Sequence, residues 1–223
     1  MRVVALHGMP TSPRLFERLQ LPAGWELVAP QVPGLGRGGT PRNWSLRSCA
    51  AELRPVAEGA DILVGHDMGG VLCAMVARPG QTVVLSGTAL GMYWTMIRIT
   101  TLPLLRGFFY DRYVGQRFLR EGGLPEHVPS LLEAFGDHGG DWSNRMQTVA
   151  RRMKAPPGLP VVLRSCGVRL AWGRKDPWYP NYIAHTVRRT TGGRLHWLES
   201  GHFGPWEDPR GFADVITGQA FVA

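Results

Sequence analysis

Six short apolar runs, separated by segments of helical character, constrain the fold of this chain more than any other feature. The runs are rich in Val, Leu and Ile with little polar alternation, which is typical of strands buried on both faces of a parallel sheet. Strands are predicted at residues 3–6, 26–29, 61–64, 82–86, 168–172 and 194–198. Helices are predicted at residues 13–19, 46–58, 69–77, 181–190 and 209–221. This alternation predicts right-handed βαβ units in an α/β fold with a doubly wound, mainly parallel sheet.

The stretch between the fourth and fifth strands, residues 87–167, breaks the alternation. A structureless loop of that length is uncommon in a compact domain, and this one is rich in aromatic residues. We therefore predict a short helical lid at residues 91–159, inserted in a core made of residues 1–90 and 160–223. Ligands bind beyond the carboxyl ends of the strands in such sheets, so the residues that follow each strand are the candidates for a site.

Composition and charge argue against several classes of partner. The net charge is +8, but the basic residues are scattered and no Lys/Arg run reaches five, so we expect no nucleic-acid partner. No apolar stretch reaches the roughly 18 residues that span a membrane, and no signal peptide opens the chain, so we expect a cytoplasmic protein without a membrane partner. The 3 cysteines form no metal-binding or disulfide pattern, and we expect neither a metal nor a cofactor.

The most specific motif follows the third predicted strand, where residues 65–69 read Gly-His-Asp-Met-Gly. Gly-x-nucleophile-x-Gly between a strand and a helix is the pattern of a nucleophile elbow, in which a sharp turn lifts the central side chain clear of the sheet. The central residue here is Asp67, which would also suit a simple helix N-cap. Asp176 follows the fifth strand and His202 the sixth, which gives the order nucleophile, acid, His along the chain.

These motifs together resemble the α/β-hydrolase superfamily over nearly the whole chain, and most closely its Asp-nucleophile branch of epoxide hydrolases and haloalkane dehalogenases. The matching segments are His7 to Pro10, Gly65 to Gly70, Trp172 to Asp176 and Gly201 to Phe203. The sequence departs from the family in lacking its first two strands, which predicts a six-stranded, wholly parallel sheet. It also has a short lid, and Gln31 stands where many relatives have Asp.

The resemblance implies a role for each of the central residues. Asp67 would attack an sp³ carbon and form an alkyl-enzyme ester, because carboxylate attack on an ordinary ester would give an anhydride. His202, oriented by Asp176, would then activate a water to hydrolyse that ester. The backbone N–H groups of Met9 and Met68 would form the oxyanion hole.

Further residues are assigned supporting roles. The resemblance implies that lid tyrosines donate protons to an epoxide oxygen, and the candidates are Tyr93, Tyr110 and Tyr113. His7, Gly8 and Pro10 would support the oxyanion loop, and His66 would support the elbow.

The predicted reaction is the opening of an epoxide to a vicinal diol. A haloalkane dehalogenase is an alternative, but the side chains of Met9 and Met68 offer no donor for a halide. A cyclase or lyase acting on a biosynthetic intermediate with the same Asp/His pair is a further alternative, and a ligand receptor without catalysis is the third. The expected partner is a small molecule, an apolar epoxide, and an exposed apolar lid would support a homodimer.

Overall fold

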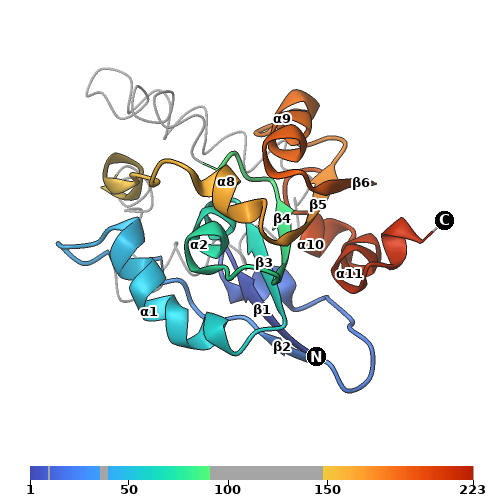
Figure 1. Ribbon diagram of the computed structural model, residues 1–223, viewed down its shortest axis with the longest axis horizontal. Helices are drawn as coiled ribbons and strands as arrows, with labels where there is room; N and C mark the ends of the chain where they lie inside the picture. The colour runs from blue at the N-terminus through green and yellow to red at the C-terminus, as the bar shows by residue number, and fades with distance from the viewer. Residues whose placement is uncertain (10, 36–39, 91–147, 223) are drawn as a thin grey trace.

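A six-stranded, wholly parallel sheet forms the centre of the molecule, as predicted (Figure 1). The computed structural model describes residues 1–9, 11–35, 40–90 and 148–222. Across the sheet the strand order is β2-β1-β3-β4-β5-β6. The strands are β1 (Arg2–Leu6), β2 (Glu26–Val28), β3 (Ile62–His66), β4 (Thr82–Ser86), β5 (Gly167–Gly173) and β6 (Arg194–Leu198).

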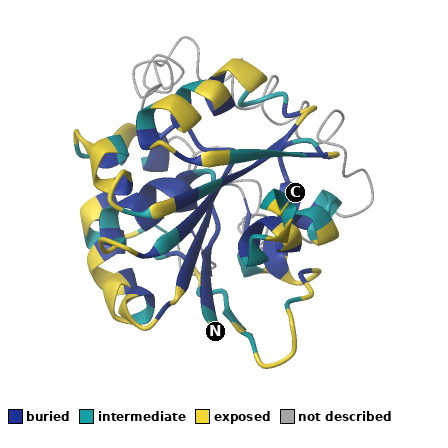
Figure 2. Ribbon diagram, turned by 45° about the vertical axis from the view of Figure 1, so that its right-hand side comes forward, coloured by how far each residue is buried: buried dark blue, intermediate teal, exposed yellow. Residues whose placement is uncertain are grey.

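Burial along the strands follows their position in the sheet (Figure 2). Every residue of the central strand β3 is buried, whereas the edge strands β2 and β6 begin with an exposed residue and continue with partly buried ones, apart from the buried Leu198 at the end of β6. Uniformly apolar sequence therefore marks the strands that are covered on both faces.

Helices cover both faces of the sheet (Figures 1 and 2). On one face α1, α2, α8 and α9 form a layer in which each helix contacts the next. On the other face α11 packs against β5 and β6, and α10 contacts both α11 and η1. The helices are η1 (Pro13–Phe16), α1 (Leu46–Glu58), α2 (Met68–Val76), α8 (Leu159–Leu163), α9 (Asn181–Thr191), α10 (Gly204–Glu207), α11 (Pro209–Thr217) and η3 (Gln219–Phe221).

Two helical predictions need correction. The segment predicted at residues 13–19 is a short 3₁₀ helix, because its backbone closes three-residue turns such as Leu15 N–H to Ser12 O at 3.0 Å. The helix predicted at residues 209–221 is interrupted by Gly218, whose φ of 90° ends α11 in a left-handed C-cap. The structure also contains α8 and α10, which were not predicted.

Residues 91–147 lie outside the described part of the chain, so most of the predicted lid does too, together with Tyr93, Tyr110 and Tyr113. In the ranges that are described, no helix is long and apolar enough to cross a bilayer.

Candidate active site

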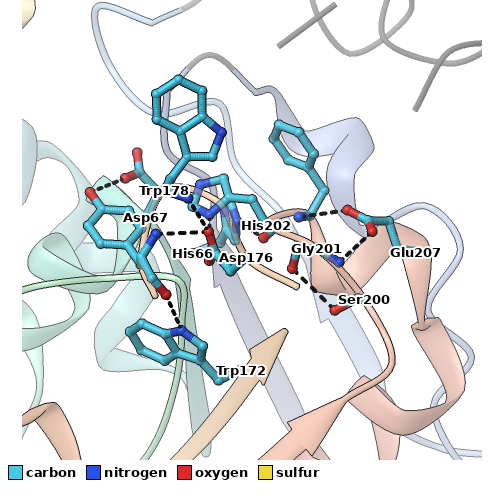
Figure 3. A network of polar contacts seen from close by, with 11 residues as sticks. His66, Asp67, Trp172, Asp176, Trp178, Ser200, Gly201, His202 and Glu207 are labelled. Atoms are coloured by element: carbon cyan, nitrogen blue, oxygen red, sulfur yellow. Dashed lines mark hydrogen bonds and ion pairs between the residues drawn. The ribbon is translucent and has the colours of Figure 1, made fainter. Parts of the chain in front are cut away.

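Three loops at the carboxyl edge of the sheet bring Asp67, Asp176 and His202 together (Figure 3). Asp67 directly follows β3, Asp176 follows β5, and His202 follows β6. The order of the strands explains the grouping, because β3 and β5 both flank β4, and β6 lies beside β5. Residues that are more than a hundred positions apart in the sequence therefore meet at one edge.

Asp67 adopts the strained backbone conformation of an elbow, with φ 52° and ψ −119°. Such a conformation costs on the order of 1–3 kcal/mol in a residue other than glycine. The turn is held by the Asp67 N–H, which donates to Ser86 O at 3.0 Å, and by the Gly70 N–H, which donates to Asp67 O at 3.1 Å. The side chain makes no cap bond to α2, which argues against the N-cap interpretation.

The flanking glycines allow the strand and the helix to approach closely at this turn. A Cβ on Gly65 would lie 2.5 Å from the Gly70 Cα, so no larger residue fits there without a shift of the backbone. The pattern of glycines in the sequence thus has a direct steric cause.

The Asp67 carboxylate accepts hydrogen bonds from two different loops. The Met9 N–H donates to Oδ2 at 2.9 Å, and the Tyr179 hydroxyl donates to Oδ1 at 3.0 Å. Burial raises the pKa of Asp67, while the charge of His202, the N–H groups of Met68 and Met9 and the Tyr179 hydroxyl act in the opposite direction. Of the two N–H groups predicted for an oxyanion hole, that of Met9 donates to Oδ2, and that of Met68 lies at the first residue of α2, next to Asp67.

His202 and Asp176 form a buried pair, with 2.9 Å between His202 Nδ1 and Asp176 Oδ2. The second oxygen of Asp176 accepts the N–H groups of Trp178 and Tyr179 at 2.8 and 2.9 Å, which fixes the orientation of the carboxylate. Burial lowers the pKa of His202, but the charge and hydrogen bond of Asp176 outweigh it, with Asp67 and Glu207 adding to them, and the pKa is raised. Asp176 thus holds the proton on Nδ1 and leaves Nε2 as the basic nitrogen.

Glu207, which sequence analysis did not single out, holds the backbone on both sides of His202 (Figure 3). Its two carboxylate oxygens accept the Gly201 N–H at 2.6 Å and the Phe203 N–H at 2.9 Å. This clamp fixes the loop that carries the imidazole. No short sequence motif predicts the role of Glu207, because its carboxylate comes from helix α10, which was not predicted.

His7 is neutral and bridges two loops. Burial lowers its pKa to about 4. Its Nε2 accepts the Val32 N–H at 3.0 Å, so the proton lies on Nδ1, which donates to Gly8 O at 3.1 Å. The Gln31 amide nitrogen lies 3.0 Å from the same Nε2, which suits an uncharged imidazole. These contacts hold the backbone next to Met9; the neighbouring Pro10 lies outside the described residues.

His66, the residue before Asp67, contacts the histidine loop. Its Nε2 donates to His202 O at 2.9 Å, and the two imidazole rings lie 4.7 Å apart. Burial places the pKa of His66 well below its usual value, so the ring is neutral. The Nδ1 atom is buried without a hydrogen-bond partner among the described residues. His66 thus connects the elbow to the loop of His202.

Tyr179 is the second residue that sequence analysis missed, and it touches all three members of the predicted triad. Besides its bonds to Asp67 and Asp176, its ring lies 5.5 Å from the His202 ring. The Trp172 Nε1–H donates to Tyr179 O at 2.8 Å and fixes the backbone. The sequence feature that could have indicated Tyr179 is its position three residues after the predicted acid, in the segment Asp-Pro-Trp-Tyr-Pro.

Over the ranges that the structure covers, no group of three or more His, Cys, Asp or Glu side chains is arranged to hold a metal ion. Asp67, Asp176 and His202 instead hydrogen-bond to protein groups, an arrangement that suits acid, base and nucleophilic chemistry.

The sheet, the elbow and the acid–histidine pair define a protein of the α/β-hydrolase class. The sequence profile of the Alpha/beta hydrolase family matches residues 3–215, and the chain belongs to that family. No curated protein matches the chain.

Solved structures of the same fold include several hydrolases. An esterase (EaEST) from Exiguobacterium antarcticum is 19% identical with a TM-score of 0.73, over 100% of this chain and 92% of that one. The enol-lactonase from Burkholderia xenovorans LB400 is 14% identical with a TM-score of 0.73, over 99% and 91%. A structure described under novel epoxide hydrolases in metagenomes from hot environments is 20% identical with a TM-score of 0.69, over 100% and 91%. At these identities the likeness establishes the fold alone.

Proposed function

We propose that the protein hydrolyses an apolar epoxide to a vicinal diol through an ester on Asp67. The observation that carries the proposal is the carboxylate at the elbow, whose Oδ2 accepts the Met9 N–H at 2.9 Å. A carboxylate in this position is suited to attack on an sp³ carbon, because attack on an ordinary ester would leave an anhydride.

In the first half-reaction Asp67 Oδ1 attacks an epoxide carbon, and the carbon–oxygen bond of the ring breaks. The ring oxygen leaves with the electron pair and takes up a proton. Oδ2 keeps the Met9 N–H as its donor throughout, so it becomes the carbonyl oxygen of the ester.

In the second half-reaction His202 Nε2 removes a proton from a water that attacks the ester carbonyl. The Met9 N–H, which donates to Oδ2, then stabilises the negative charge that develops on it, and the Met68 N–H is the proposed second donor. Asp176, 2.9 Å from Nδ1, stabilises the imidazolium that forms. Collapse of the tetrahedral intermediate releases the product alkoxide, which takes up a proton to give the diol. The Asp67 carboxyl group then loses the proton that came from water, which restores the carboxylate and balances the proton consumed when the epoxide opened.

Two alternatives use the same residues. A haloalkane dehalogenase would form the same kind of ester, but the methionine side chains beside the nucleophile offer no donor to a departing halide. A cyclase or lyase would use Asp67 and His202 as an acid–base pair and form no covalent ester. A structure described as an epoxide hydrolase shares the fold, and so do esterases, so the comparisons leave the leaving group to experiment.

Trapping of the ester tests the proposal. His202→Gln removes the general base, so incubation with a panel of aryl and alkyl epoxides should leave an enzyme heavier by the full mass of one epoxide, measured by intact-protein mass spectrometry. Peptide mapping should place the adduct on Asp67. His185→Gln is the matched control, because His185 is exposed on α9. This variant keeps His202 as the base, so it should hydrolyse the ester and show no stable adduct.

Incubation of the same variant with a second panel, of 1-haloalkanes, separates the alternatives. A mass gain equal to the alkyl group without its halogen would establish dehalogenation. If His202→Gln gives no adduct with either panel while diol formation by the wild-type enzyme is also absent, the epoxide proposal is wrong and the cyclase or lyase alternative gains support. An Asp67→Asn variant should give no adduct in any case.

A further inference from the structure

The Tyr179 hydroxyl lies 3.0 Å from Asp67 Oδ1, the oxygen that is not held by the Met9 N–H. Tyr179 is fixed in place by its own backbone, since its N–H donates to Asp176 at 2.9 Å and its carbonyl accepts the Trp172 indole N–H at 2.8 Å. The phenol is therefore a rigidly placed proton donor on one particular oxygen of the nucleophile.

The two carboxylate oxygens have different fates in the proposed reaction. Oδ2 remains on its backbone donor and becomes the ester carbonyl oxygen. Oδ1 forms the bond to substrate carbon, and it is also the oxygen that departs with the product when the ester is hydrolysed. It leaves as an alkoxide, which requires a proton as the bond to Cγ breaks.

We infer that Tyr179 is the general acid of the second half-reaction, donating its hydroxyl proton to Oδ1 as the product alcohol leaves Cγ. This inference rests on the proposed function and deepens it by naming a donor that the His202 base does not supply at that oxygen. Tyr179 is a catalytic residue in this assignment, because it contacts the reacting oxygen directly.

The proton balance of the step is complete. Water adds to Cγ, and its first proton goes to His202 Nε2. The Cγ–Oδ1 bond breaks, its electron pair stays on Oδ1, and the Tyr179 proton completes the alcohol. Proton return from the His202 imidazolium to the phenolate, whose rings lie 5.5 Å apart, restores both groups. Asp67 is left as a carboxylic acid with one oxygen and one proton from water. Loss of that proton restores the carboxylate and balances the proton that the epoxide oxygen took up in the first half-reaction.

The same geometry argues against Tyr179 as the acid for epoxide opening. Displacement at an sp³ carbon places the attacking and departing oxygens on opposite sides of that carbon. A phenol at hydrogen-bond distance from the attacking oxygen lies beside the wrong oxygen for that step. Epoxide opening therefore needs another donor, and the predicted lid tyrosines remain the candidates for it.

Tyr179→Phe tests the inference because it removes only the hydroxyl. With His202 intact, the variant should accumulate the Asp67 ester after mixing with an epoxide, since ester hydrolysis should slow by about 10²–10⁴-fold while alkylation persists. Rapid quenching followed by intact-protein mass spectrometry measures both rates. Tyr182→Phe is the matched control, because Tyr182 lies on α9 and is 60% exposed, and it should behave as wild type.

A series of epoxides whose product alcohols differ in acidity separates acid catalysis from a merely structural effect. Loss of a proton donor should make ester hydrolysis depend steeply on the acidity of the departing alcohol in Tyr179→Phe, and only weakly in the wild-type enzyme. A wild-type rate that depends steeply on that acidity contradicts the inference, and this arm does not depend on the folding of any variant.

The inference and the proposed function fail in different ways. If His202→Gln traps the ester but Tyr179→Phe hydrolyses it at the wild-type rate, the role of Tyr179 is wrong and the proposed function stands. If neither variant nor the wild-type enzyme ever carries an ester, both are wrong. A Tyr179→Phe variant that slows every substrate by the same factor would reduce Tyr179 to a positioning residue and overturn the inference.

Discussion

Each ionisable residue of the site has neighbours that set its charge. The Asp67 carboxylate accepts hydrogen bonds from the Met9 N–H and from the phenol of Tyr179. This set fits the ionised carboxylate, which is the nucleophilic form, although burial raises the pKa. His202 faces the carboxylate of Asp176 at 2.9 Å, which holds one nitrogen protonated and leaves the other as a base.

The pH dependence of ester hydrolysis follows from the pKa of His202. Burial lowers this pKa and Asp176 raises it, and the net shift is upward from 6.5. Only the neutral imidazole accepts a proton from water, so hydrolysis should increase as pH rises through this pKa. Asp176→Asn removes the largest raising influence, so the midpoint should move to lower pH while the plateau rate also falls.

Single-turnover decay of the ester across a pH series measures that midpoint. Asp214→Asn is the control, because Asp214 is exposed on α11 and should leave the midpoint unchanged. A midpoint that stays fixed or rises in Asp176→Asn would contradict the assignment of His202 as the base.

Tyr179 was missed by sequence analysis because its role depends on contact between distant segments. Tyr179 and Asp67 are separated by 112 positions, and no local motif relates them. Asp67, Asp176 and His202 could be predicted because each directly follows a strand in a recognisable pattern. The contacts of Tyr179 depend instead on how the loop after β5 folds back over the elbow.

At the scale of elements, strands were predicted more accurately than helices. The structure places β4 and β6 at the predicted residues, because buried parallel strands read as plain apolar runs. Two short helices, α8 and α10, were missed, since Pro and Gly near their first turns are typical of loops as well. Short helices owe their formation to packing more than to local sequence.

The packing of α2 against β1 depends on the absence of a side chain at Gly69. A Cβ there would overlap the carbonyl oxygen of Leu6 and approach His7 O to 2.9 Å, and neither backbone atom can move aside easily. Gly69→Ala should therefore lower the free energy of unfolding by about 1–3 kcal/mol, even though Ala favours helix. The shift of α2 should also displace the Met68 N–H and lower the alkylation rate.

Chemical denaturation and ester-formation kinetics measure these two effects. Gly167→Ala is the matched control, because a Cβ on Gly167 would meet its nearest neighbour at 3.7 Å, an ordinary contact. If Gly69→Ala is as stable and as active as Gly167→Ala, the close approach of α2 and β1 is not a requirement of the elbow.

At the scale of the molecule, the fold supplies the frame and the loops supply the chemistry. The parallel strand order places the loops after β3, β5 and β6 at one edge of the sheet, where the three predicted residues meet (Figures 1 and 3). The net charge of +8 arises from basic residues that are scattered along the chain. Esterases and an enol-lactonase have the same fold, so the reaction has to be inferred from Asp67 and the groups around it.

The central claim is that the oxygen delivered to the substrate comes from Asp67. A single turnover of excess enzyme with an epoxide in heavy-oxygen water tests it directly by mass spectrometry of the diol and of the peptide that contains Asp67. The account predicts an unlabelled diol and one heavy oxygen in the Asp67 carboxylate, because water attacks the ester and not the substrate. A labelled diol with an unlabelled Asp67 would show direct attack by water and would contradict the account.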